Sequence, residues 1–156
     1  MSRAEPDSSG VMLPPPFIYL VGLGIGWLLD AWYPLGRIPD TARWVLGGTL
    51  GVAGLGIMLS ALRLMRRAGT AINPTKPTTR LVLAGPFRFT RNPLYLSLLL
   101  IYGAIAVLTN GIWGLVLLPA VIVTLQRVVI SKEEAYLERR FGEEYRSYRA
   151  RVRRWI

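Results

Sequence analysis

The sequence predicts an all-α integral membrane protein with four transmembrane helices and a C-terminal amphipathic helix on the cytoplasmic side. Hydrophobic residues make up 52% of the 156 residues and the mean hydropathy is +0.37, although the formal net charge is +10. Residues 44–62 and 94–126 contain no Asp, Glu, Lys or Arg, whereas arginines crowd the stretches beside them. Long uncharged apolar runs next to arginine blocks are typical of helices that span a bilayer. The length fits one domain, so residues 1–156 are treated as a single unit.

Four apolar segments are expected to cross the membrane, at about residues 17–33, 42–65, 94–109 and 111–130. A spanning helix needs roughly 17–25 residues, so the first and third segments are short. Asn110-Gly111 separates the last two segments, and Asn-Gly is a strong turn signal. The third and fourth segments therefore predict a tight antiparallel helical hairpin.

Glycines recur in the first two segments. The stretch from Gly22 to Gly26 resembles part of a dinucleotide-binding fingerprint, but that motif needs a preceding strand and a following soluble helix. Pairs such as Gly22 with Gly26, or Gly47 with Gly51, instead have the spacing that lets membrane helices approach closely. We interpret these glycines as packing residues.

The distribution of Lys and Arg among the connections predicts the orientation. The connection between the first two segments holds Arg37 and Arg43, and the one between the last two holds neither Lys nor Arg. Eight Lys and Arg residues follow the fourth segment, from Lys132 to Arg154. Six lie between the second and third segments: Arg66, Arg67, Lys76, Arg80, Arg88 and Arg91. The positive-inside rule then places the basic connection, the tail and both termini in the cytoplasm. The compact size suggests a multi-pass protein of a prokaryotic inner membrane.

The tail from Ser131 has a helical pattern too polar to span a bilayer. Gly142 interrupts this pattern and is expected to break the helix in two. Two interpretations stay open: the aromatic face lies on the membrane surface, or it packs against the bundle. The apolar and aromatic residues recur three or four positions apart: Leu137, Phe141, Tyr145, Tyr148, Val152 and Trp155.

The chain lacks both cysteine and histidine. This composition excludes disulfides, thiolate nucleophiles and Ser-His-Asp triads, and we expect no metal site. The sequence pI near 10.8 also suits nucleic-acid binding. The membrane topology already accounts for the arginines, however, and no nucleic-acid-binding module is present. We therefore expect no nucleic-acid partner.

Two clusters on the predicted cytoplasmic side are candidates for chemistry. The first, residues 79–95, leads into the third segment at Pro93, a residue type that suits the first turn of a helix. Free backbone donors at such a helix start, flanked by arginines, suit the carboxylate of a ligand. The second cluster is Glu133-Glu134, directly after the fourth segment. A carboxylate pair among arginines is more often an ion-pair cluster than a ligand site.

These clusters resemble two motifs of one enzyme family. The stretch from Gly85 to Tyr95 (GPFRFTRNPLY) is similar to the G-x-Y-x-x-x-R-H-P-x-Y segment of the isoprenylcysteine carboxyl methyltransferases and related phospholipid methyltransferases. The tail from Glu133 to Tyr148 is similar to that family's E-E-x-x-L…F-G-x-x-Y-x-x-Y pattern. Both motifs occur in the right order with one helical hairpin between them, and the resemblance covers roughly residues 63–154.

The resemblance implies S-adenosyl-L-methionine as the methyl donor, bound at the cytoplasmic end of the bundle by residues of about 79–95 and 131–148. Glu133 would hold the amino group or ribose of the cofactor, and Glu134 would support it. Phe87 stands where the family usually has tyrosine, so it can stack but cannot donate a hydroxyl bond. The other implied cofactor residues are Thr79, Arg80, Leu81, Val82, Asn92, Pro93, Leu94 and Tyr95.

Two positions depart from the family pattern. Asn92 replaces the common histidine, so it can donate a hydrogen bond but cannot titrate. Val129 occupies the position of an arginine that faces the substrate in eukaryotic members. Arg127, the nearest arginine in sequence, could replace it, and Arg91 is the second candidate catalytic residue. These departures affect the expected substrate more than the cofactor.

The resemblance thus implies methyl transfer to a lipophilic acceptor that enters from the bilayer. Isoprenylcysteine-like carboxylates, amino-phospholipids and small apolar thiols or acids all fit as acceptors, and O-, N- and S-methylation stay open. The alternative is a non-enzymatic membrane protein whose basic tail binds anionic lipid. That alternative explains the arginines but not the paired motifs. The oligomeric state is not predicted.

Overall fold

The structure is a computed structural model that describes residues 14–72 and 77–156. Lys76, one of the six residues counted in the basic connection, lies outside the described residues. Within these ranges every regular element is helical and no strand occurs. The predicted all-helical class is confirmed for this part of the chain.

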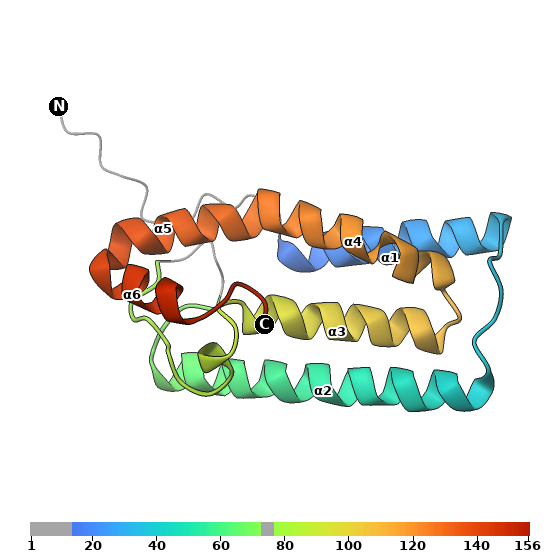
Figure 1. The fold of residues 1–156 in the computed structure, drawn as a ribbon, viewed down its shortest axis with the longest axis horizontal. Coiled ribbons are helices and arrows are strands. Elements are labelled where there is room, and N and C mark those ends of the chain that lie inside the picture. Colours follow the sequence, from blue (N-terminus) through green and yellow to red (C-terminus); the bar gives the residue numbers. More distant parts are fainter. Residues whose placement is uncertain (1–13, 73–76) are drawn as a thin grey trace.

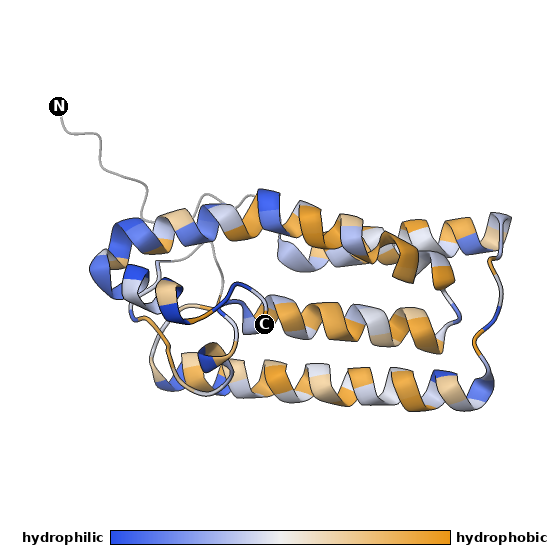
Figure 2. Ribbon diagram, in the orientation of Figure 1, coloured by the Kyte–Doolittle hydropathy of each residue, from blue (hydrophilic) through white to orange (hydrophobic). Residues whose placement is uncertain are grey.

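The long helices lie side by side and a charged helical segment continues beyond one end (Figure 1). The charged end, formed by α5 and α6, contrasts with the apolar bodies of the long helices in Figure 2. A π-helical turn joins α4 to α5 without a break. The elements are α1 (Pro15–Trp32), α2 (Asp40–Arg67), the 3-10 helix η1 (Gly85–Arg88), α3 (Pro93–Leu108), α4 (Ile112–Leu125), the π-helical turn η2 (Gln126–Ile130), α5 (Ser131–Phe141) and α6 (Glu143–Arg151).

Among the described residues, three helices are long and apolar enough to cross a membrane: α1, α2 and the continuous helix Ile112–Phe141. The fourth apolar helix, α3, has 16 residues and therefore a length of about 24 Å. The continuous helix has 30 residues, more than the roughly 20 that a span requires. Its charged residues are concentrated after Ser131, so α5 extends past the apolar stretch.

The first three predicted segments agree with α1, α2 and α3 to within two residues at each end. The fourth was expected to end at Ile130, but the helix runs on to Phe141. No glycine or proline interrupts the helix between Ile130 and Phe141. The Ser131 hydroxyl donates to the Gln126 carbonyl, five residues earlier in the π-helical turn, at 2.7 Å. Gly142, with φ of 52°, then ends α5 where the sequence predicted a break.

The predicted turn between the third and fourth segments is confirmed. Asn110 adopts φ of 55°, a left-handed conformation that asparagine tolerates. Its side-chain oxygen accepts a hydrogen bond from the Ile38 amide at 2.9 Å. The same turn therefore also fixes the connection between α1 and α2.

Several glycines lie where helices touch. A Cβ at Gly26 would lie 2.7 Å from the Gly114 backbone nitrogen, so α1 and α4 meet backbone to backbone. A Cβ at Gly47 would lie 2.5 Å from Leu108 Cγ, on the contact between α2 and α3. The packing interpretation is confirmed at these positions. Gly51 is less constrained, since its Cβ would make an ordinary 3.7 Å contact with Ala104 Cβ.

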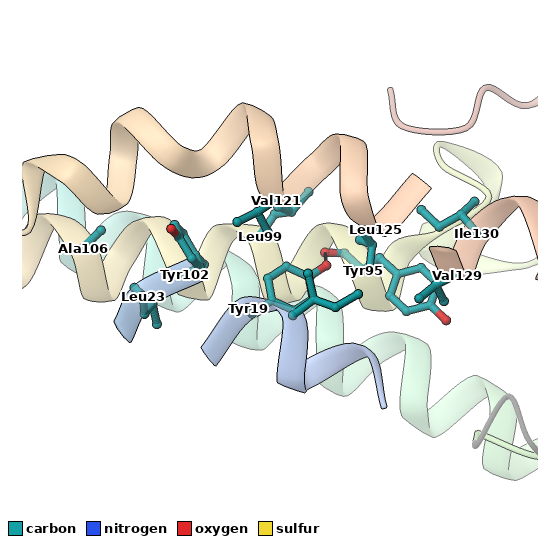
Figure 3. Packing of buried hydrophobic residues seen from close by; sticks show 11 residues of the cluster. Tyr19, Leu23, Tyr95, Leu99, Tyr102, Ala106, Val121, Leu125, Val129 and Ile130 are labelled. Carbon is teal, nitrogen blue, oxygen red and sulfur yellow. Dashed lines mark hydrogen bonds between the residues drawn. The ribbon is translucent and has the colours of Figure 1, made fainter. Parts of the chain in front are cut away.

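The core lies between α1, α3 and the continuous α4–α5 helix (Figure 3). The Tyr19 hydroxyl donates to the Tyr95 carbonyl at 3.0 Å. The Tyr102 hydroxyl donates to the Gly114 carbonyl at 2.8 Å, which ties α3 to α4. These bonds satisfy the two buried hydroxyl groups and fix the position of α3 along the bundle axis.

Candidate functional site

A cavity of about 460 Å³ lies at the charged end of the bundle. Its volume is within the range of about 300–1,000 Å³ found for small-molecule sites. Residues of both predicted motif regions line it, together with an apolar wall from α1 and α2. The lining comprises Pro15, Pro16, Met58, Leu62, Met65, Thr70, Ala71, Ile72, Thr78, Arg80, Leu81, Val82, Phe87, Arg91, Asn92, Pro93, Leu94, Tyr95, Leu98, Glu133, Glu134, Leu137, Tyr145 and Tyr148.

Most of the residues predicted from the sequence meet at this cavity, and two do not. Thr79 is exposed, and its hydroxyl donates to the Gly69 carbonyl at 2.9 Å. Its neighbour Thr78 lines the cavity instead. Arg127 is exposed on the π-helical turn and is absent from the lining. Arg91, the second candidate catalytic arginine, lies in the cavity wall.

Glu133 forms part of the polar end of the cavity. The Tyr95 hydroxyl donates to Glu133 Oε2 at 2.7 Å, which links α5 to the start of α3. Burial raises the pKa of Glu133 to about 7, and the nearby charge of Glu134 adds to the rise, whereas the bond from Tyr95 opposes it. The carboxyl group thus changes its charge near neutral pH in the ligand-free protein.

Glu134 lies behind Glu133 in a network of ion pairs. Arg154 binds it with two hydrogen bonds, from Nε to Oε1 at 3.0 Å and from Nη2 to Oε2 at 2.6 Å. Arg91 Nη1 lies 3.3 Å from Glu134 Oε1. The Glu134 residue is only 6% exposed. A buried carboxylate requires such partners, since removing one leaves an uncompensated charge.

The last residues of the chain, 152–156, cross the start of α3 and form a segment that we name the C-terminal strap. The Arg153 carbonyl accepts from the Arg91 amide at 3.0 Å. The Arg154 carbonyl accepts from the Thr90 hydroxyl and from the Asn92 side-chain amide, each at 3.0 Å. Figure 1 shows the C-terminus beside the first turn of α3. Asn92, which occupies the histidine position of the family motif, therefore uses its donor on the strap.

Tyrosines of the C-terminal helices hold the motif loop against the bundle. The Tyr136 hydroxyl accepts from the Thr78 amide at 3.0 Å, and the Tyr148 hydroxyl donates to the Phe87 carbonyl at 2.7 Å. Tyr145 is 1% exposed. The aromatic face of the tail thus packs against the bundle, one of the two interpretations left open by the sequence.

Sequence reasoning missed two groups of site residues. Arg154 is one of eight Lys and Arg residues in the tail, and no spacing singles it out as the partner of Glu134. Met58, Leu62 and Met65 form the apolar wall from α2. Their i, i+4 and i+7 spacing is a detectable signal, but a lipid-facing stripe has the same pattern.

Fold and site together define an all-helical protein of the membrane type, with a ligand-sized cavity where two motif regions converge. The profile of the phospholipid methyltransferase family matches residues 42–144, from the first turn of α2 to the start of α6. The chain belongs to the phospholipid methyltransferase family. This agrees with the resemblance noted in the motifs and implies methyltransferase activity in general.

One similar protein is an uncharacterised protein of Haemophilus influenzae, 44% identical over 64 residues. The alignment covers 40% of this chain and 100% of that protein. No solved structure matches the chain.

Proposed function

We propose that the protein transfers a methyl group from S-adenosyl-L-methionine to a lipophilic acceptor at the cytoplasmic face of a membrane. An isoprenylcysteine-like carboxylate and an amino-phospholipid are the two proposed classes of acceptor. The observation that carries the proposal is the cavity, since it gathers both family motif regions at one end of the bundle. An anionic-lipid-binding protein would not require such a cavity.

The cavity residues fit the chemistry of the proposed cofactor. Glu133 supplies a carboxylate that suits an amino group or ribose hydroxyls, Glu134 would support it, and Arg91 supplies a cation that suits a carboxylate. Phe87 and Leu81 supply an aromatic and an apolar surface for a purine ring. Glu133 would hold the amino group or ribose, with Tyr95 orienting its carboxylate through the 2.7 Å bond.

Little acid-base chemistry is required of the protein. When bound, S-adenosyl-L-methionine supplies a methyl group already activated on a sulfonium sulfur and departs as a neutral thioether. The protein has to align the acceptor and exclude water, and positioning of this kind can lower a barrier by about 7–11 kcal/mol in favourable cases. This role suits a chain without histidine or cysteine.

The acceptor would reach the cavity from the bilayer. Pro15 of α1 and Met58, Leu62 and Met65 of α2 form an apolar wall of the cavity, which would face the membrane in the proposed topology. In the proposed topology α3 crosses as a fourth, short span, tilted little and packed along α2. Both termini would then lie in the cytoplasm with the basic tail. Because α2 and α3 make extensive contact, α3 is supported by protein along its length.

Isothermal titration of the detergent-purified protein with S-adenosylhomocysteine, the expected product, tests the proposal. Saturable binding at one site per chain is expected, with a large loss of affinity in Glu133→Gln. The matched control is Glu144→Gln, because Glu144 is an exposed glutamate of α6 outside the cavity. Well-folded protein that does not bind up to millimolar ligand would refute the proposal and favour anionic-lipid binding.

A further inference from the structure

Aromatic side chains gather at the end of the bundle opposite to the cavity. At this end α1 terminates, and α2 and α4 begin (Figure 1). Four of the five tryptophans of the chain lie within about two turns of these helix ends, whereas Trp155 lies in the C-terminal strap. We name the group at the helix ends the aromatic collar; it comprises Trp27, Trp32, Tyr33, Trp44 and Trp113.

The aromatic collar contributes little to the protein core. Trp32 is 88% exposed, Tyr33 is 69% exposed and Trp44 is 64% exposed. Trp155, by contrast, packs against the core. Aromatic side chains bury about 150–250 Å² each when they pack in a core, so leaving several outside it forgoes a large stabilisation. The exposed rings therefore indicate a partner that is not part of the bundle.

Two rings of the collar are held in place through their indole N–H groups. Trp27 Nε1 donates to Thr109 Oγ1 at 3.2 Å, which joins α1 to the end of α3. Trp113 Nε1 donates to the Tyr33 carbonyl at 2.7 Å, which joins the start of α4 to the end of α1. These bonds hold three helix ends together, so the collar belongs to the ordered end of the bundle.

The charges at this end balance, unlike those at the cavity end. Residues 30–43 contain two Asp and two Arg. Arg43 pairs with Asp40 at 2.9 Å, and its guanidinium lies 5.5 Å from the centroid of the Trp44 ring. Net charge thus gives this end no preference for an anion or a cation. The complementary partner is one that accommodates apolar rings with polar edges.

The spacing of the collar matches the layers of a bilayer. Trp27 and Trp32 are five residues apart, which is about 7.5 Å along α1, and each interfacial layer of a bilayer is about 5–8 Å deep. Along α2, the first charged residue after Trp44 is Arg63, nineteen residues and about 28.5 Å further on. The hydrocarbon layer is about 30 Å thick. Trp44 and Arg63 are therefore separated by about one hydrocarbon layer.

We propose that the aromatic collar binds the interfacial layer of the membrane, between acyl chains and headgroups, and anchors the end of the bundle opposite to the cavity. Trp and Tyr are enriched at this level because their apolar rings and polar edges suit it. The collar continues the apolar outer faces of α1 and α2, where Leu28 is 65% exposed and Val45 is 61% exposed. The inference does not depend on the proposed function, because none of the collar residues lines the cavity.

Tryptophan fluorescence in phosphatidylcholine vesicles tests where the collar lies. Lipids brominated near the glycerol end of the acyl chains are compared with lipids brominated near the chain terminus, and aqueous iodide reports exposure to water. Combining Trp32→Phe with Trp44→Phe should lower the emission quenched by the shallow bromines by about half, since two of the four collar tryptophans are removed. The matched control is Trp155→Phe, which should keep the shallow quenching because Trp155 packs against the core.

The depth of a nitroxide label tests the anchoring. The chain has no cysteine, so Ala31→Cys, at an exposed residue beside Trp32, provides a single labelling position. Combining Trp32→Leu with Trp44→Leu replaces interfacial side chains by ones that prefer hydrocarbon. The label should then move toward the acyl chains, with more frequent collisions with oxygen and fewer with a water-soluble nickel complex. Trp155→Leu should leave the label at the wild-type depth.

The outcomes separate lipid from the other partners of an exposed aromatic surface. Shallow quenching of the two rings, with a deeper label in the leucine variant, supports the anchor. Quenching of the rings by iodide alone overturns it, because the collar then lies in water. Protection from both bromine and iodide also overturns it, because a second copy or another protein then covers the collar. An unmoved label refutes the anchoring role, whether or not the protein binds S-adenosylhomocysteine.

Discussion

The ionisation of Glu133 predicts a steep pH dependence of cofactor binding. Burial places the pKa of this carboxyl group at about 7 in the ligand-free protein, well above its ordinary value. A ligand amino group or ribose hydroxyl bonds most strongly to the ionised form. Acidification protonates Glu133, and binding must then expel that proton. Affinity should therefore fall as the pH drops below 7.

The magnitude follows from the populations of the two forms. With a pKa of about 7, about half of the molecules carry the carboxylate at pH 7, about one in eleven at pH 6 and about one in a hundred at pH 5. If only the ionised form binds, the dissociation constant of S-adenosylhomocysteine should rise about fivefold from pH 7 to pH 6. From pH 7 to pH 5 the rise should be about fiftyfold.

Isothermal titration at pH 7, 6 and 5 measures this dependence directly. Glu133→Gln should bind about tenfold or more weakly at pH 7, and its affinity should change little with pH. Glu144→Gln should keep the wild-type dependence. A flat profile in the wild type, or the same slope in Glu133→Gln, would refute the assignment of Glu133 as the group whose charge the ligand requires.

Three further predictions concern the same architecture. Tyr95→Phe removes the hydrogen bond that lowers the pKa of Glu133, so the midpoint of the pH profile of S-adenosylhomocysteine binding should move above 7; an unmoved midpoint would contradict the bond. Gly26→Ala should destabilise the bundle by about 1–3 kcal/mol, measured by thermal unfolding in detergent, because its Cβ would lie 2.7 Å from the Gly114 nitrogen. The control is Gly24→Ala, which faces open space and should be tolerated. Removal of residues 152–156 should lower the affinity for S-adenosylhomocysteine, because it leaves Glu134 without Arg154; wild-type affinity in the shortened chain would argue against a role for the strap.

Helix positions could be predicted from the sequence because charge and hydropathy change sharply at their ends. The Asn110-Gly111 turn and the break at Gly142 also followed from residue type, since both need left-handed backbone or flexibility. The end of the fourth helix could not be predicted. The change from apolar to charged residues at Ser131 marks the end of the apolar stretch, but it does not end a helix unless the backbone is interrupted.

The motif residues of the site could be predicted, but the contacts between them could not. Glu133 and Tyr95 are both motif residues, yet only the packing of α5 against α3 brings their oxygens within 2.7 Å. The sequence left Glu134 open between ion-pair cluster and ligand residue, and the structure shows its ion pairs. Its partner Arg154 is 20 residues away and resembles the other tail arginines. Long-range pairing of this type depends on tertiary structure that local pattern does not contain.

The continuous helix Ile112–Phe141 has a consequence for the membrane environment of the site. At 30 residues it is about 45 Å long, whereas the hydrocarbon layer is about 30 Å thick. Glu133 lies on this helix, so the distance of its carboxylate from the hydrocarbon layer depends on bilayer thickness and helix tilt. Hydrophobic mismatch in thick or thin bilayers would shift the carboxylate relative to the headgroups. Methyltransferase activity toward a single acceptor should therefore be highest at one acyl-chain length of the surrounding bilayer lipids.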